Sequence, residues 1–181
     1  MLTKTEYADA QRRATAMIRE SGMCFTEDEL EKVEVADFGL SWLDVEGAQI
    51  LTIVATDRIA VKIIALFPRQ TLPEHWHPRV GDDPGKEETV RVITGVVRFY
   101  IPGNERMKEG FIPPGKEDVY TMRRELILKP GEQMTLQPGT KHWFQAGKTG
   151  AVMFSFSTVA RDVLDGFTDP TIRRMTEIQE T

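Results

Sequence analysis

The sequence predicts a mainly β fold, an antiparallel sandwich or barrel that follows a helical N-terminal segment. Three observations favour this fold class. Seven short runs between residues 50 and 156 are rich in β-branched and aromatic residues, and glycine, proline and aspartate separate them. No helix is indicated between these runs, which argues against parallel βαβ units. Apolar residues at helical spacing occur near the two ends of the chain.

The N-terminal segment carries the clearest helical signals. Residues 5–20 have apolar side chains near helical spacing, and Gly22 is a plausible stop. These apolar side chains are Tyr7, Ala8, Ala14, Met17 and Ile18. Thr26 and Glu29 form a capping box, so a second short helix is predicted to start there. From Thr168 the apolar spacing predicts a return to helical structure.

The predicted strands follow one another through the middle of the chain. They cover residues 50–55, 59–67, 88–93, 96–101, 125–128, 133–136 and 151–156. Residues 102–116 contain three prolines and three glycines, so they are expected to form a long exposed connection. We interpret residues 1–181 as a single domain, with a helical segment over 1–35, a barrel over 45–160 and a tail over 161–181.

Composition narrows the range of partners. The chain has 181 residues, of which 40% are hydrophobic and 28% charged, and its net charge is −5. The charges are mixed and form no basic run, so neither nucleic acid nor a membrane surface is expected as a partner. Cys24 is the only cysteine, which excludes an internal disulfide and a cysteine site for zinc. We expect a buried Cys24 and a cytoplasmic protein.

The three histidines of the chain form a recognisable pattern. His75 and His77 are two residues apart, and side chains at that spacing in a strand point to the same face. His142 follows a Pro-Gly turn, and Glu88 begins a predicted strand. Three neutral imidazoles and one carboxylate suit Mn, Fe, Co, Ni or Zn and leave coordination positions open. The sequence therefore predicts a divalent metal held by these four side chains.

These residues resemble the two motifs of the cupin superfamily. The first motif, H-x-H, a gap, E, six residues and G, is matched by His75, His77, Glu88 and Gly95. The second is matched by Gly131, Gly139 and His142, with Gln137 where proline is usual. The resemblance implies a cupin double-stranded β-helix, a jelly-roll barrel, with the N-terminal helices packed outside. It also favours a homodimer, because cupins of this size often pair and so protect their sheet edges.

Longer strings are similar to the bacterial D-lyxose isomerases, the short cupin type. They occupy residues 73–78, 85–89, 140–147 and 167–170, and the similarity runs from about residue 37 to residue 172. This family carries an extended loop where ten residues separate His77 from Glu88. The resemblance implies conversion of D-lyxose to D-xylulose through an enediol, a side activity on D-mannose giving D-fructose, and manganese as the usual metal. Such an ion acidifies the proton at C2 of the sugar.

The resemblance also suggests residues that act on the sugar. It implies an active-site lysine at Lys86, for proton transfer or oxyanion support; the alternative is a solvated loop lysine. Lys62 interrupts an apolar strand, so it points either into the barrel toward a sugar hydroxyl or to the outer face. Tyr120 and Phe144 are candidate pocket walls or plain core, and Glu74 is a candidate substrate contact.

One position departs from the family pattern. The resemblance implies a general-base glutamate on the strand after the third histidine, and Ser155 stands at that place. Loss of a general base slows catalysis by about two to four orders of magnitude. Glu74 or Glu87 could take the place of the missing base by reaching the sugar from another wall of the cavity. Alternatively, Lys86 could transfer the proton alone. The remaining alternative is another activity, either a non-catalytic sugar- or metabolite-binding cupin or an iron-dependent cupin dioxygenase.

Overall fold

A curled antiparallel sheet holds most of the chain in the computed structural model, which describes residues 1–179. The helices are α1 (Lys4–Glu20), α2 (Glu27–Leu30) and the 3₁₀ turn η1 (Asp162–Leu164). The strands are β1 (Leu2–Thr3), β2 (Glu34–Ala36), β3 (Ala48–Ala55), β4 (Ile59–Leu66), β5 (Thr71–Trp76), β6 (Glu88–Ile101), β7 (Arg124–Leu128), β8 (Gln133–Leu136), β9 (His142–Thr158), β10 (Gly166–Phe167) and β11 (Ile178–Gln179).

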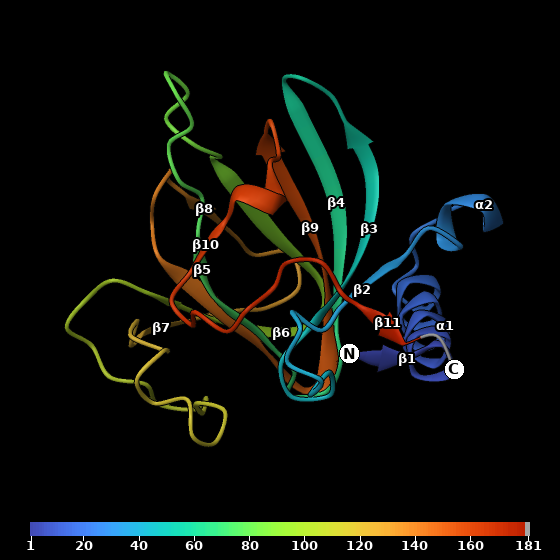
Figure 1. The fold of residues 1–181 in the computed structure, drawn as a ribbon, viewed down its shortest axis with the longest axis horizontal. Helices are drawn as coiled ribbons and strands as arrows, with labels where there is room; N and C mark the ends of the chain where they lie inside the picture. The colour runs from blue at the N-terminus through green and yellow to red at the C-terminus, as the bar shows by residue number, and fades with distance from the viewer. Residues whose placement is uncertain (180–181) are drawn as a thin grey trace.

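Two long strands, β6 and β9, organise the sheet. The main path runs β10-β5-β9-β4-β3-β2, and β6 pairs with β7, β8 and β9 (Figure 1). The first part of β9 lies against β5 and the later part against β4, while β6 follows β9 over most of its length. Register shifts next to Gly95 interrupt the pairing of β6 with β9. Irregularities of this kind bend a sheet, so they help it to curl.

Each face of the curled sheet has its own apolar cluster. On β4, Ile64 and Leu66 belong to the cluster inside the curl, whereas Ile63 and Ala65 belong to the cluster under the helices. This alternation is the strand period of two, with both faces buried. The predicted mainly β barrel with helices outside it is therefore confirmed.

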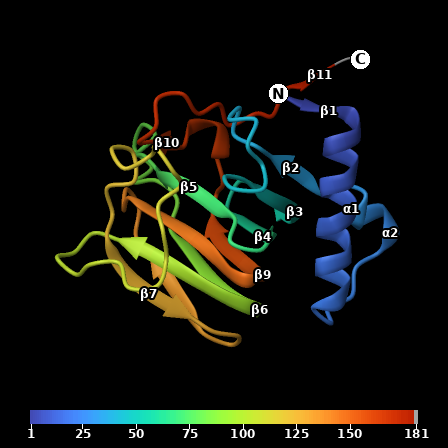
Figure 2. The ribbon, with the colours of Figure 1, turned by 90° about the horizontal axis from the view of Figure 1, so that it is seen from below.

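Helix α1 covers the outer face beside β2 and β3 (Figure 2). It begins at Thr3, whose side chain forms a capping box with Glu6, and it buries Ala10, Ala14 and Ile18 against the sheet. The predicted capping box of Thr26 with Glu29 is also present, at the start of α2. No helix within residues 1–179 is long and apolar enough to cross a membrane.

The structure corrects three expectations. The tail after Thr168 is not helical: Ile178 and Gln179 form β11, which pairs in parallel with β1, and Met175 is 63% exposed. The apolar spacing there does not mark a buried helical face; residues 180–181 lie outside the described range. Cys24 is exposed rather than buried. The two strands predicted over 88–101 are the single strand β6.

Candidate metal centre and active site

Two strand ends bring the histidines together inside the curl. His75 lies in β5, His77 follows directly after it, and His142 opens β9, where it pairs with His75. One ring nitrogen from each of the three lies within 4.8 Å of the others, and all three side chains are buried. The ring centroids of His75 and His142 are 4.2 Å apart. Imidazoles from two distant parts of the sequence thus face one point.

Glu88, the first residue of β6, completes this group. Its Oε2 lies 3.2 Å from Nε2 of His77 and 4.0 Å from Nε2 of His142. Its other carboxylate oxygen accepts a hydrogen bond from the hydroxyl of Ser155. Ligands that each sit about 2.1 Å from one ion lie about 3 Å apart, so the spacing between His77 and Glu88 fits shared coordination.

Hydrogen bonds fix the orientation of all three rings. Nδ1 of His75 donates to the Pro73 carbonyl at 2.8 Å, and Nδ1 of His142 donates to the Thr140 carbonyl at 2.9 Å. Nδ1 of His77 lies 2.8 Å from the Asp165 carboxylate. With the proton on Nδ1, Nε2 of His75 and of His142 carries a free lone pair, as in metal-binding histidines, whereas Nε2 of His77 lies 3.2 Å from a carboxylate oxygen of Glu88. Nε2 of His142 is buried without a hydrogen-bond partner, which fits an acceptor meant for a cation.

The charge states of His75, His142 and Glu88 fit a cation, whereas His77 holds a proton more tightly. Burial lowers the pKa of His142 to about 4 and that of His75 well below its usual range, so both rings are neutral at pH 7. Burial opposes ionisation of Glu88 and protonation of His77. Lys86 and His77 nevertheless hold the pKa of Glu88 well below its usual range. Asp165 and Glu88 raise the pKa of His77.

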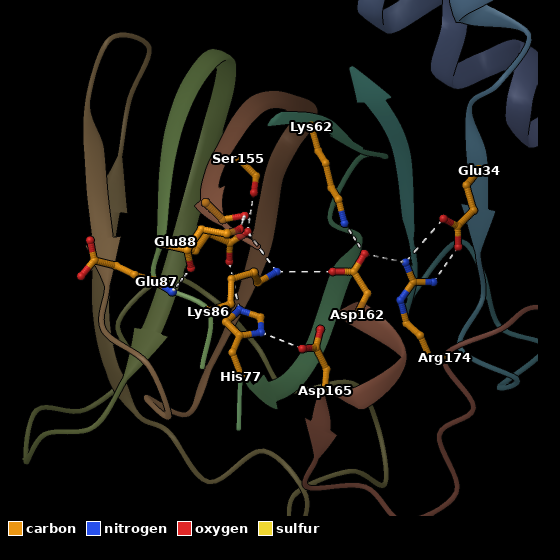
Figure 3. Close-up of polar contacts among 12 residues, drawn as sticks. Glu34, Lys62, His77, Lys86, Glu87, Glu88, Ser155, Asp162, Asp165 and Arg174 are labelled. Carbon is orange, nitrogen blue, oxygen red and sulfur yellow. Dashed lines mark hydrogen bonds and ion pairs between the residues drawn. The ribbon is translucent and has the colours of Figure 1, made fainter. Parts of the chain in front are cut away.

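A cavity opens beside this group, and Figure 3 shows the charged side chains gathered along it. It is lined by Phe38, Ile50, Lys62, Ile64, Leu72, His75, Lys86, Glu88, Phe144, Asp162, Asp165, Phe167 and Arg174. The Lys86 ammonium lies 3.7 Å from Glu88 and 3.5 Å from Asp162. Burial opposes the ionised form of Asp162, but Lys86 and Lys62 lower its pKa to about 2.

The C-terminal segment supplies site residues that the sequence analysis missed. Asp162 is on η1, Asp165 follows it, and Arg174 pairs with both Glu34 at 2.6 Å and Asp162 at 3.6 Å. The one sequence signal for these three residues is that they flank the string at 167–170, which resembles the family. This stretch has neither strand alternation nor a metal motif, so its sequence predicts only a tail.

The structure brings only some of the predicted substrate residues to the cavity. Lys62 on the interior strand β4 and Phe144 on β9 line it, as does Lys86, which is 8% exposed. Glu74 and Tyr120 are not among its lining residues.

The side chains of Glu74 and Tyr120 are occupied elsewhere. The Glu74 carboxylate accepts hydrogen bonds from the backbone amides of Thr121 and Met122 and from the hydroxyls of Thr121 and Thr168. The Tyr120 hydroxyl donates to Glu46 at 2.6 Å. Alternation along β5 explains why Glu74 faces away from the side occupied by its neighbour His75. Both residues therefore hold loops against the barrel.

Comparison with known proteins identifies the family. The family model described as D-lyxose isomerase matches residues 6–181. The chain belongs to the D-lyxose isomerase family. It is 51% identical to the D-lyxose ketol-isomerase of Cohnella laeviribosi over 97% of each chain. It is 44% identical to the D-lyxose/D-mannose isomerase of Thermosediminibacter oceani, over 99% of this chain and 100% of that one.

Solved structures support the fold of this family member. The L-ribose isomerase of Acinetobacter sp. DL28, in complex with L-ribose, superposes with a TM-score of 0.83 at 16% identity. The L-ribose isomerase of Cellulomonas parahominis gives a TM-score of 0.82, also at 16% identity. Each comparison covers 98% of both chains. The fold of those proteins is thus shared over 98% of this chain.

Ser155 is placed where it touches the candidate metal ligands. It lies on β9, paired across the sheet with Lys62 and Val90, and it is 2% exposed. Its hydroxyl donates to Glu88, so its local function is to hold that carboxylate in one orientation. The replacement of a family glutamate by Ser155 stays a prediction of the sequence.

Proposed function

We propose that the protein is a metal-dependent aldose–ketose isomerase of free sugars that converts D-lyxose to D-xylulose. D-Mannose, giving D-fructose, is proposed as a second substrate. The observation that carries the proposal is the convergence of three buried imidazoles and Glu88 beside a cavity whose lining includes His75 and Glu88. The names of the relatives, D-lyxose ketol-isomerase and D-lyxose/D-mannose isomerase, support the choice of sugar.

In this proposal His75, His77, Glu88 and His142 hold one divalent ion, most simply Mn²⁺ as the family resemblance implies. When bound, the ion polarises a carbonyl oxygen and the adjacent hydroxyl of a sugar. The Lys86 ammonium lies beside Glu88 and supports the negative charge that develops on the sugar oxygens. Lys62 is placed to hydrogen-bond a hydroxyl, and Phe144 gives an apolar surface for the C–H face of the sugar.

The charges of the cavity favour a free sugar over a sugar phosphate. Its three cationic side chains, Lys62, Lys86 and Arg174, are already paired with carboxylates. A phosphate group carries nearly two negative charges, and binding it would require a surplus of cations. Hydroxyl groups, in contrast, can hydrogen-bond to both members of an ion pair.

The proposal extends to a homodimeric protein of the cytoplasm, by analogy with cupins and with the sequence expectation. Light scattering on the purified protein tests the dimer, since a mass near twice 20.5 kDa is expected. Cell fractionation tests the location.

The direct test is an isomerisation assay on metal-stripped protein before and after addition of Mn²⁺. We expect D-lyxose to be converted fastest, D-mannose more slowly, and the phosphate esters of these sugars not at all. Conversion should require the metal. Absence of ketose from every aldose with Mn²⁺, Fe²⁺, Co²⁺, Ni²⁺ and Zn²⁺ would overturn the proposal. Oxygen consumption by the Fe²⁺ form, without ketose, would indicate the dioxygenase alternative instead.

A further inference from the structure

Aldose–ketose isomerisation needs a group that carries a proton between two carbons, and the cavity offers few candidates. Among the residues that line it, the carboxylates are Glu88, Asp162 and Asp165. Glu88 belongs to the candidate metal ligands, and Asp165 is hydrogen-bonded to the imidazole of His77. Within residues 1–179, Asp162 forms its ion pairs with Lys62, Lys86 and Arg174 and none with the four candidate ligands. It is thus the one lining carboxylate left for the sugar.

The other groups considered from the sequence do not reach this position. Glu87 is exposed, and its side chain points away from the cavity group in Figure 3. The Glu74 carboxylate is saturated by four hydrogen bonds from residues of the surrounding loops. The Ser155 hydroxyl donates a hydrogen bond to Glu88, and a hydroxyl is a poor base at neutral pH.

Asp162 is held in place by three cations and faces the cavity. Lys62, Lys86 and Arg174 all contact its carboxylate, and they come from β4, from the loop before β6 and from the tail. Its neighbours on η1, Val163 and Leu164, are 68% and 47% exposed. The turn therefore presents its apolar residues to solvent and its carboxylate to the cavity. The Lys86 ammonium spans the gap between Asp162 and Glu88.

We propose that Asp162 is the catalytic proton carrier, an inference that rests on the proposed isomerase function. Its carboxylate oxygen takes the proton from C2 of the aldose, the C2–H electron pair forms the C1=C2 bond, and the carbonyl electron pair moves to O1. The protonated Asp162 then returns its proton to C1 as O2 becomes the carbonyl oxygen. The hydroxyl proton of O2 passes to O1, so aldose and ketose balance in atoms and electrons.

The cations around Asp162 serve this step. They keep the carboxylate ionised, ready to accept a proton. A sugar that enters between Lys86 and Asp162 takes hydrogen bonds from the ammonium group, weakens the ion pair and makes the carboxylate a stronger base. The family resemblance implies a general-base glutamate on the strand; in this proposal an aspartate on the turn just beyond that strand does its work.

The test compares Asp162→Asn with Asp162→Glu and with the exposed control Asp57→Asn, all loaded with Mn²⁺. We expect Asp162→Asn to lower kcat for D-lyxose by about 10²- to 10⁴-fold, to change KM by less than tenfold, and to keep the metal content of the wild type. Exchange of the C2 proton with solvent D₂O, followed by NMR, should slow by the same factor as kcat. Asp162→Glu should retain more activity than Asp162→Asn, and Asp57→Asn should match the wild type.

Formate rescue separates proton transfer from a structural role. In Asp162→Ala the three cations still surround the vacated position, so added formate should raise kcat at least tenfold in a concentration-dependent manner. Ser155→Glu should not accelerate the wild-type reaction, because the base is already present. The inference is overturned if Asp162→Asn keeps kcat within tenfold of the wild type, if formate has no effect, or if Ser155→Glu greatly raises the rate. A wild-type protein without turnover overturns the proposed function itself.

Discussion

The two sides of the cavity come from different kinds of structure. The histidines and Glu88 sit at or next to the ends of β5, β6 and β9, where strand pairing holds the backbone of His75, Glu88 and His142. Asp162, Asp165 and Arg174 come from the segment after β9, which has one short 3₁₀ turn and few strand pairs. The side of the cavity that carries the candidate metal ligands is thus held by backbone hydrogen bonds between strands. The opposite side depends on ion pairs with residues from elsewhere in the chain, such as Glu34 and Lys62.

This difference explains how charge is distributed across the cavity. The strand side keeps two neutral imidazoles and a carboxylate free to bind a cation. The tail side contributes Asp165, which orients His77, and Asp162, which balances the two lysines. A ligand site and its charge balance can therefore come from separate parts of one chain. Variants of the strand residues should accordingly lose metal affinity, whereas Asp162 variants should lose activity and keep the metal.

The largest effect is expected on the strand side. His142→Ala removes one of four candidate ligands and should reduce metal affinity by more than the 10- to 100-fold typical of losing an outer partner. Metal content after gel filtration, measured by elemental analysis, checks this. Lys148→Ala, an exposed position on the same strand, is the matched control and should retain its metal. Equal metal content in the two variants would remove His142 from the ligand set.

Asp165→Asn tests whether the segment after β9 also affects metal binding. The change removes the negative charge that holds the His77 imidazole, so metal affinity should fall by about 10- to 100-fold. Asp162→Asn is the matched control, since Asp162 holds lysines rather than a ligand. Titration of metal-stripped protein with Mn²⁺ measures both. If both variants bind Mn²⁺ alike, Asp165 has no special part in orienting the ligand.

Metal affinity should depend on pH through His77. Burial lowers the pKa of His77, but Asp165 and Glu88 raise it more, so the pKa is raised overall. Protons therefore begin to compete with the metal for His77 at a higher pH than for an ordinary imidazole. Below that pKa the apparent affinity should fall about tenfold per pH unit. In Asp165→Asn the pKa of His77 drops and the decline should begin at lower pH. Calorimetric titrations between pH 5 and 8, a range set by ordinary imidazole titration, measure the effect.

The smallest effect is expected outside both sides of the cavity. Thr26→Ala removes the cap of α2 and should lower the free energy of unfolding by about 1 kcal/mol, with no change in metal affinity. Urea denaturation measures the loss, and Thr26→Ser, which keeps the hydroxyl, should recover most of it. A change in metal binding on Thr26→Ala would show that the helical segment and the site are coupled.

The strand ends and the convergence of the candidate metal ligands were predictable because their signals are local. The spacing of His75 and His77, and Glu88 at the start of a strand, follow directly from alternation along β structure. The capping box at Thr26 is equally local, and it was found. The family strings at 73–78 and 140–147 added the cupin topology, which spacing alone does not specify.

The tail side could not be predicted because its contacts are non-local. Asp162 and Lys62 are 100 residues apart, and Arg174 and Glu34 are 140 residues apart. Alternation and helical periodicity carry no information about such pairs. The failed helix after Thr168 has the same cause, since β11 is fixed by pairing with β1 at the other end of the chain. The partners of Glu74, which lie in the loops at Thr121, Met122 and Thr168, are equally remote in sequence.

Anomalous diffraction from crystals of Mn²⁺-loaded protein tests the central claim most directly. The account predicts one strong manganese peak about 2.0 to 2.3 Å from Nε2 of His75, His77 and His142 and from a carboxylate oxygen of Glu88. A manganese peak elsewhere, or none within bonding distance of these four side chains, would contradict it.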